Sequence, residues 1–273
     1  MKQFPGVFRA TKKNGDVYYR SSVTFRSKHI SLGSFSCPEA AHNAYNTASN
    51  LLHSEINYLP DNYQKGDLSF LKWVILTNFK NNGIYIKTPI YLQKNYFEYY
   101  LSQNDVLLFD ADDLFYYSTH SIMRRGNHLF VADYGMQVNI ASRYGIKNFA
   151  VQNRDYRFVN GNDHDFRYAN IEILNSYHGV SRQPDSFPPV YITRIHVNGD
   201  HIVGRFESEN EAAAAYNKAA DLLQKAGISI QYTRNYLPGL SAAHYQKLYQ
   251  QVCPEPRFLD YIHSLRSIDR KDE

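Results

Sequence analysis

An internal repeat is the feature that most constrains how this chain of 273 residues folds. Two segments carry the same residues in the same order and at nearly the same spacing. The first reads Gly6-Val7, Val17-Tyr18, Leu32-Gly33-Ser34-Phe35, Ala44-Tyr45-Asn46, Leu51-Leu52 and Asn57-Tyr58-Leu59-Pro60, and the second reads Gly179-Val180, Val190-Tyr191, Val203-Gly204-Arg205-Phe206, Ala215-Tyr216-Asn217, Leu222-Leu223 and Asn235-Tyr236-Leu237-Pro238. Between Gly33 and Leu52 the offset is constant at 171 residues, and the second copy has seven extra residues around Lys225–Gln231. The repeat predicts two related structural modules.

Each copy predicts a β-rich stretch followed by one amphipathic helix. Polar turn residues stand at Lys13–Asp16 and Val197–Asp200, beside segments rich in β-branched and aromatic residues. Apolar residues then recur at helical spacing, namely Ala40, Ala41, Ala44, Tyr45, Ala48, Leu51 and Leu52 in the first copy and Ala212, Ala215, Tyr216, Ala219, Leu222 and Leu223 in the second. The small alanine side chains allow each helix to lie close to its sheet.

The starts of these helices and the faces of the preceding strands are also predictable. Ser36 with Glu39, and Ser208 with Glu211, have the spacing of capping boxes, although the two pairs are one residue apart in the repeat register. Strand alternation directs Val23, Phe25, Ile195 and Val197 toward the helices, and Arg20, Ser22, Thr24, Arg26, Ile192, Arg194 and His196 away from them. A three-stranded sheet with an open, partly cationic face suits a DNA major groove, and a plain solvated face is the alternative.

Positive charge is concentrated in the N-terminal segment. Residues 1–60 hold seven Lys and Arg against three acidic residues, whereas 61–176, 177–238 and 239–273 balance at 12 and 12, 6 and 6, and 5 and 5. The whole net charge of +4 therefore lies in the first copy. Such clustering is typical of a surface that faces phosphates, and it also occurs on ordinary solvated faces. The 24 Tyr and 16 Phe favour a β-rich core.

Both copies resemble the APETALA2-type DNA-binding domain, a three-stranded antiparallel sheet packed on one helix. The resemblance rests on Gly6-Val7, Leu32-Gly33-Ser34-Phe35, Glu39-Ala40-Ala41, Ala44-Tyr45-Asn46 and their partners in the second copy, and it covers residues 4–60 and 177–238. Members of that family read the major groove with Arg and aromatic side chains of the sheet. By position, the resemblance implies DNA contacts for Arg9, Arg20, Thr24, Arg26, Arg182, Arg194 and His196. Phe8 and Ser181 stand where plant members often carry Arg, so no target sequence follows.

The segment between the modules resembles a homing endonuclease of the HNH type that has lost catalytic groups. The resemblance rests on Asn160-Gly161-Asn162, Asp165, Arg167 and Asn170, which match that family's framework. The family holds a divalent metal with an aspartate and activates water with a histidine. Arg157 and Phe158 stand at those two positions, and Gln137 or a neighbour stands at the family's earlier histidine. A cation repels a metal ion and Phe accepts no proton, so the centre is expected to be inactive.

Other residues offer possible replacements for the lost groups. Asp155 lies two residues before the aspartate position, on the same strand face, and His164 and Asp165 follow in the connecting loop. Asp110, Asp112 and Asp113 form an acidic cluster that is either a metal site or a solvated turn. Apolar alternation in this region predicts strands near Ile84–Ile86, Val106–Phe109 and Leu129–Ala132.

The chain carries no pattern typical of secretion or of a membrane protein. It has two cysteines, Cys37 and Cys253, and neither belongs to a metal-binding spacing. The first ten residues have no apolar signal core, and no apolar run approaches the length of a membrane span. We therefore expect a soluble cytoplasmic protein without a disulfide framework.

The sequence thus predicts an α+β chain with an APETALA2-like module at 1–60, a degenerate HNH-like domain at 61–176, a second module at 177–238 and a helical tail at 239–273. Leu240, His244, Leu248 and Val252, and then Phe258, Leu259 and Ile262, define that tail. The expected function is a sequence-specific regulator of transcription that binds double-stranded DNA, with no cofactor, no metal and no catalytic residue. The residues expected to contact DNA are Arg9, Lys12, Lys13, Arg20, Thr24, Arg26, Lys28, Arg157, Arg167, Arg182, Arg194, His196 and Arg205. An active metal-dependent nuclease and an architectural protein without sequence preference are the alternatives, and the oligomeric state stays open.

Overall fold

The computed structural model describes residues 4–268, with side chains described to residue 265. The chain has an α+β fold and divides into two compact units, of which unit 1 comprises Met1–Tyr144 and Asn160–Asn170, and unit 2 comprises Gly145–Val159 and Ile171–Glu273. The elements of unit 1 are β1 (Val7–Thr11), β2 (Val17–Phe25), β3 (Lys28–Phe35), α1 (Pro38–His53), α2 (Phe70–Asn82), β4 (Ile90–Leu92), β5 (Tyr96–Ser102), β6 (Asp105–Asp110), α3 (Leu114–Thr119), β7 (Ile122–Arg125), β8 (His128–Asp133) and β9 (Met136–Asn139). Those of unit 2 are β10 (Tyr156–Phe158), β11 (Ile171–Ile173), β12 (Val180–Arg182), β13 (Tyr191–His196), β14 (Asp200–Phe206), α4 (Glu209–Lys225), α5 (Ala242–Gln251) and α6 (Pro256–Ile268).

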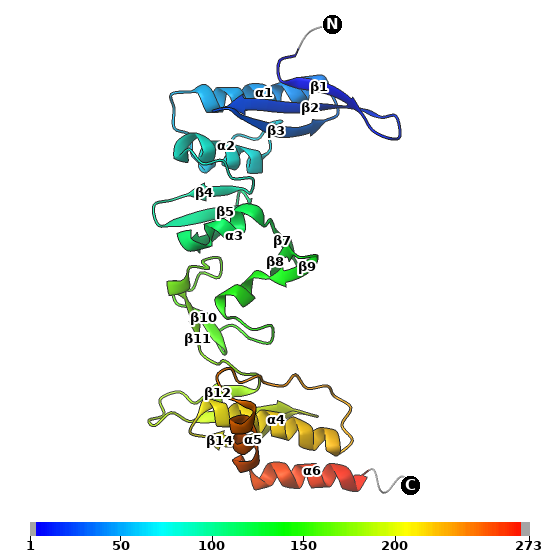
Figure 1. The fold of residues 1–273 in the computed structure, drawn as a ribbon, viewed down its shortest axis with the longest axis vertical. Helices are drawn as coiled ribbons and strands as arrows, with labels where there is room; N and C mark the ends of the chain where they lie inside the picture. Colours follow the sequence, from blue (N-terminus) through cyan, green and yellow to red (C-terminus); the bar gives the residue numbers. More distant parts are fainter. Residues whose placement is uncertain (1–3, 269–273) are drawn as a thin grey trace. The chain divides into compact units, whose positions relative to one another are not determined.

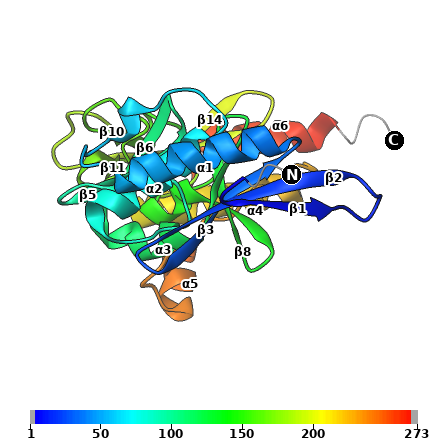
Figure 2. The same ribbon diagram turned by 90° about the horizontal axis from the view of Figure 1, so that it is seen from above.

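The first repeated segment folds as a three-stranded antiparallel sheet covered by one helix. The strands pair in the order β1-β2-β3, and α1 lies along one face of the sheet (Figures 1 and 2). Val23, Ile30 and Leu32 of the sheet pack against Ala44, Ala48 and Leu51 of the helix, and all six are buried. The predicted strands, helix and inward-facing Val23 are therefore confirmed.

The second repeated segment has the same architecture. Its strands pair in the order β12-β13-β14, and α4 contacts all three of them. Each sheet has an irregularity at the same place, where Leu32 or Val203 is the extra residue between two neighbouring pairs of the ladder. Ile195 and Val197 are buried in the core with the alanine face of α4, as the alternation predicts.

A glycine and a tyrosine of the repeat signature are in contact in both modules. A Cβ atom placed on Gly6 would overlap the ring of Tyr45, and one on Gly179 would overlap the ring of Tyr216. Both glycines also have positive φ, at 73° and 71°. Two separate reasons therefore favour glycine at these positions. The backbone is left-handed there, and the neighbouring tyrosine ring leaves no space for a side chain.

The repeat continues one helix beyond the residues recognised in the sequence. Helix α2 packs against α1, and α5 packs against α4. Ser69 and Ser241 are the respective N-caps, and each Oγ accepts a hydrogen bond from the backbone N three residues later. Trp73 and Tyr245 then occupy the same position in the two helices, four residues after the cap. The core of the first module consequently extends past residue 60, since Trp73 belongs to it.

Two sequence predictions for these modules need correction. The capping box of Ser208 and Glu211 is present at α4, but α1 is preceded by Cys37 without a side-chain cap. Pro38 occupies the first turn of α1, so the helix begins one residue later than the Ser36 pattern requires. Ile84–Ile86 is irregular chain instead of a strand, because α2 ends at Gly83 with φ of 76° and β4 begins later.

The rest of unit 1 consists of two further three-stranded sheets, β4-β5-β6 and β7-β8-β9. The predicted strands at Val106–Phe109 and Leu129–Ala132 correspond to β6 and β8. Residues 160–170 join unit 1 through β6, where the backbone of Leu108 bonds to His164 and Phe166. In unit 2 the predicted tail forms α5 and α6, and Val252, Phe258 and Ile262 are buried in the core of the second module. No helix within residues 4–268 has both the length and the apolar character needed to cross a bilayer.

Candidate nucleic-acid interface

Strand pairing decides which side chains lie on the open face of the first sheet. Phe8 pairs with Arg20, which pairs in turn with Ser34, and Thr24 pairs with His29. These residues alternate with the buried Val23, so they lie on the face away from α1, and all of them are exposed. Phe8 is a large apolar side chain with 56% of its surface exposed. Its strand position is paired directly with that of Arg20. No carboxylate lies at a strand position on this face.

The cations Lys12 and Lys13 lie at the turn between β1 and β2. Both are exposed, and the hairpin extends beyond the end of α1 in both views (Figures 1 and 2). Within residues 4–268 no acidic group pairs with either lysine. The turn is closed by the Lys12 backbone N donating to the oxygen of Asp16 at 2.8 Å. The tip of the β1–β2 hairpin therefore presents two exposed positive charges that are not in ion pairs with any described residue.

The second turn of the same sheet holds Arg26 and Lys28, so the predicted outward-facing strand position of Arg26 is wrong. Arg26 has φ of 45° and is not part of the alternating strand. Its Nη1 donates to the backbone oxygen of Phe79 at 3.4 Å, which ties it to the C-terminal end of α2. Lys28 lies over the ring of Tyr85, with Nζ 5.2 Å from the ring centroid. Both cations thus face the side of α2.

Arg9 and Arg182 occupy equivalent positions in the two modules. Arg9 pairs with Tyr19, and Arg182 pairs with Tyr191. Both tyrosines lie on the helix-facing side of their sheets and are half-buried, so the two arginines lie on that side as well. Both are exposed, because they stand near the sheet edge. They are therefore placed at the rim of the open face and not on it.

The open face of the second sheet carries Arg194, His196 and Arg205, and each of them has a partner. Arg194 Nη1 donates to Ser181 Oγ at 3.0 Å, and His196 Nδ1 lies 2.8 Å from Asp200 Oδ1. Arg205 Nη1 lies 2.9 Å from Oε1 of Glu255, the residue that precedes α6. Ile192 and Ile202 separate these polar groups. The predicted outward directions of Ile192, Arg194 and His196 are confirmed, and the neutralising role of Glu255 had no signal in the repeat.

The nuclease-like framework residues in unit 1 bond to one another. Asp165 is 1% exposed and accepts hydrogen bonds from Arg167 Nε at 2.8 Å, Arg167 Nη2 at 2.6 Å and Asn160 Nδ2 at 2.8 Å. Burial alone raises the pKa of Asp165, but these hydrogen bonds outweigh it and lower the pKa. Asn170 Oδ1 accepts from the Asn160 backbone N. These hydrogen bonds therefore stabilise the loop at residues 160–170, and Arg167 is paired with Asp165.

His164, the possible replacement base, lies in the same loop between two carboxylates. Its Nδ1 is 2.7 Å from Asp163 Oδ1, and its Nε2 is 3.2 Å from Asp105 Oδ1. Asp105 also bonds to Arg124, at 2.9 Å. His164 is partly exposed, so this arrangement belongs to a charged surface network.

The acidic cluster of unit 1 is a set of structural contacts. Asp113 is 1% exposed and accepts hydrogen bonds from Arg143 at 2.7 Å and from the Tyr144 hydroxyl at 2.9 Å. Asp110 accepts from the Tyr168 backbone N at 2.7 Å. No group of three or more His, Cys, Asp or Glu side chains in the described part of the chain is arranged to hold a metal ion.

The nuclease-like residues of unit 2 lie on and before β10. Asp155 is 3% exposed and accepts hydrogen bonds from the Val151 backbone N, at 2.8 Å, and from Arg154 Nη2, at 2.6 Å. Arg157 forms an ion pair of 2.6 Å with Glu172, its partner across the β10–β11 ladder. Phe158 is 7% exposed. Phe158 is therefore a core side chain, and Arg157 is held in a cross-strand ion pair.

The described geometry separates most of the residues expected to contact DNA into three groups. The others lie at sheet edges, as Arg9 and Arg182 do, or beside α2, as Arg26 and Lys28 do. Arg20, Thr24, Lys12 and Lys13 belong to an open face and its tip, and Arg194, His196 and Arg205 belong to a second open face with partners. Arg157 and Arg167 are held in ion pairs. Phe8 was not among the predicted contacts, although its pairing with Arg20 places it on the first face beside that arginine. In comparisons of this chain with protein-family models, curated proteins and solved structures, nothing matches.

Proposed function

We propose that this chain is a sequence-specific double-stranded-DNA-binding regulator of transcription, which applies the open faces of its two APETALA2-like sheets to the major groove. The observation that carries the proposal is the open face of the first sheet. There Arg20 and the exposed Phe8 lie side by side, no carboxylate stands on the strands, and Lys12 and Lys13 are free at the adjoining tip.

The side chains on the first face match the chemistry of a base edge. The Arg20 guanidinium can donate two hydrogen bonds to N7 and O6 of guanine, and Phe8 offers an apolar contact for a thymine methyl group. Thr24 donates or accepts one hydrogen bond. Lys12 and Lys13 are suited to phosphates, which fix the position of the protein without reading sequence. Most of the salt dependence is then due to the tip.

The second module adds a second contact region on the same chain. Linking two binding modules raises the effective concentration of the second one once the first is bound. Arg205 of this module is paired with Glu255, so the electrostatic contribution of the second module is expected to be smaller than that of the first. We therefore assign most of the affinity to the first sheet.

We further propose that the nuclease-like segment binds or braces without cutting DNA. Asp155 and Asp165, two of the possible replacement groups, each have an arginine at 2.6 Å, and Phe158 is buried. The buried salt bridges leave neither carboxylate free for a divalent ion unless an arginine is displaced. The two exposed, unpaired cysteines, Cys37 and Cys253, agree with a cytoplasmic location.

The test starts from DNA that the purified full chain selects from a random pool. Dissociation constants are measured for the selected DNA against random competitor, with the wild-type chain, Arg20→Ala and Lys65→Ala. Lys65 is an exposed cation of the same unit, away from the strands, so its removal controls for net charge. Loss of a bidentate base contact is expected to weaken the Arg20→Ala complex by about 5- to 150-fold, and Lys65→Ala is expected to change little.

The same DNA is incubated with Mg²⁺ or Mn²⁺ and inspected for cleavage. Intact DNA with a sequence-specific shift agrees with the proposal. Metal-dependent cuts would show an active nuclease instead, and equal affinity for selected and random DNA would show an architectural protein. Equal weakening by Arg20→Ala and Lys65→Ala would contradict the assignment of the first sheet face.

A further inference from the structure

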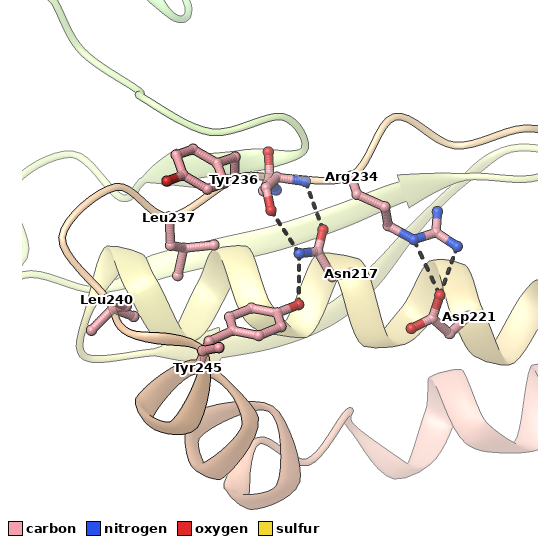
Figure 3. Close-up of a pocket in the computed structure, with 9 residues that line it drawn as sticks. Asn217, Asp221, Arg234, Tyr236, Leu237, Leu240 and Tyr245 are labelled. Carbon is pink, nitrogen blue, oxygen red and sulfur yellow. Dashed lines mark hydrogen bonds and ion pairs between the residues drawn. The ribbon is translucent and has the colours of Figure 1, made fainter.

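The second module contains a pocket at the place where the first module is filled by aromatic rings. The pocket has a volume of about 600 Å³ and lies between α4, α5 and the segment that joins them (Figure 3). Asn217 comes from α4, Leu237 and Leu240 come from the joining segment, and Tyr245 comes from α5. All of these residues belong to unit 2.

In the first module the corresponding contact between the two helices contains Trp73, at the repeat position of Tyr245. The indole is 6% exposed, and its ring centroid lies 5.5 Å from that of Tyr58 and 6.0 Å from that of Tyr63. Its Nε1 donates a hydrogen bond to the backbone oxygen of Leu59 at 3.1 Å. One planar bicyclic ring between two tyrosines therefore closes the contact between α1 and α2.

The second module lacks each part of this filling. Tyr236, the repeat partner of Tyr58, is 84% exposed, and in Figure 3 its ring lies on the joining segment away from Asn217. Eight residues separate Pro60 from Ser69 and include Tyr63, whereas two residues separate Pro238 from Ser241. The position of Trp73 is taken by Tyr245, whose single ring is smaller than an indole. A shortened segment and a smaller ring thus leave the pocket open.

Hydrogen bonds hold the walls of the pocket in place. Asn217 Nδ2 donates to the Asn235 oxygen and to the Tyr245 hydroxyl, both at 2.9 Å, and Asn217 Oδ1 accepts from the Asn235 backbone N at 2.7 Å (Figure 3). Arg234 pairs with Asp221 at 2.7 Å. Because these polar groups satisfy one another, the pocket is preformed and its charges are balanced. The leucines and tyrosine rings remain for contact with a ligand.

We propose that this pocket binds a small, uncharged, planar aromatic heterocycle of the size of an indole ring. The first module shows that this architecture accommodates such a ring between α1 and α2, in T-shaped contact with two tyrosines. The wall chemistry favours a neutral ligand, because a charged one would lose hydration and meet the already paired Arg234 and Asp221. This proposal does not depend on DNA binding.

The test titrates indole into the full-length chain and measures binding by ligand-observed saturation-transfer NMR. Leu240→Trp and Ala242→Phe each place a ring into the pocket from its exposed rim, and Leu71→Trp makes the same leucine change at an exposed position of α2. Wild-type and Leu71→Trp chains are expected to bind indole saturably. Both filling variants are expected to bind indole with an affinity at least about tenfold lower, because their added rings occupy the volume of the ligand. Circular dichroism verifies that each variant is folded.

Three results would overturn the proposal. One is the absence of saturable binding up to the solubility limit of indole. Another is equal binding by the wild-type chain and a folded filling variant, which would place indole elsewhere. The third is a wild-type dimer in sedimentation analysis that Leu240→Trp converts to monomer, because the pocket would then hold a side chain of a second copy.

Discussion

Replacing Gly179 by alanine tests the contact that defines the repeated module. The residue has φ of 71°, and an added Cβ would overlap the ring of Tyr216 and lie 2.5 Å from the backbone oxygen of Arg194. Tyr216 is 2% exposed and Arg194 belongs to the central strand of the sheet, so neither neighbour has space to move. The substitution therefore strains the backbone and the packing at once.

The two penalties are separable in magnitude. A left-handed backbone costs a non-glycine residue about 1–2 kcal/mol, and forcing extra volume into a packed core costs about 1–3 kcal/mol more. Gly179→Ala is thus expected to lower the free energy of unfolding of unit 2 by about 2–5 kcal/mol. Gly6→Ala is expected to be milder, because the ring of Tyr45 that it meets is only half-buried and has room to turn.

Urea denaturation followed by circular dichroism measures this difference, with Gly239→Ala as the matched control. Gly239 also has positive φ, at 91°, but a Cβ there meets nothing within 4 Å, so its substitution carries the backbone penalty alone. Trp73 is the only tryptophan and lies in unit 1, so its fluorescence transition is expected to stay unchanged in Gly179→Ala. A Gly179→Ala chain no less stable than Gly239→Ala would refute the steric argument.

Three other predictions concern charges. Arg167→Gln removes the partner of the buried Asp165 carboxylate and is expected to destabilise unit 1 by about 3–5 kcal/mol at pH 7 in urea melts followed by Trp73 fluorescence. The pKa of Asp165 is lowered in the folded chain, so its contribution to stability is present above the ordinary pKa of 3.8 and is lost as the pH falls through the pKa of the folded state. Melts from pH 7 to 2 should show this loss of stability in the wild type and a flatter profile in Arg167→Gln. Burial lowers the pKa of His178, so the unfolded chain binds the proton more readily than the folded chain, and unit 2 is expected to lose stability as the pH falls below 6.5. Thermal melts of His178→Phe are expected to lack that loss. A pH profile of the variant equal to that of the wild type would refute the assignment. Glu255→Gln releases Arg205 on the second sheet and is expected to raise DNA affinity at low salt and to steepen the slope of log affinity against log salt by about 0.9, whereas an unchanged slope would mean that Arg205 does not reach a phosphate.

The module fold was predictable because its signature residues are contact partners. Gly6 and Tyr45 are 39 positions apart in the sequence but touch in the structure, and the same pair recurs as Gly179 and Tyr216. A repeat conserves such pairs together, since changing one alone creates a clash or a void. The helical period of the alanines and the strand alternation around Val23 have the same origin, which is burial on one side of each element.

What the sequence did not predict depends on contacts between segments that carry no shared pattern. Helix α2 is buried on more than one side, with Leu76 and Phe79 in one core cluster and Val74 in another, so it lacks the one-sided period that marks a surface helix. The turn position of Arg26 follows from hairpin geometry and not from alternation. The ion pairs of Arg157 and Arg205 join residues 15 and 50 positions apart, and a list of charges does not reveal such pairing.

The two modules share one framework but differ in the side chains of their open sheet faces. According to the ladder registers, Arg20 of the first module is equivalent to Ile192 of the second. In the same way Ser22 is equivalent to Arg194, and Ser34 to Arg205. Buried positions recur because both cores must pack, whereas the open positions are free of that constraint and differ in size, charge and hydrogen bonding. If each sheet enters a major groove, guanine contacts from Arg20 and from Arg194 arise at different strand positions and in different surroundings. The DNA selected by the full chain is therefore expected to contain two unlike half-sites, and a direct repeat of one half-site would contradict the assignment of both faces to base reading.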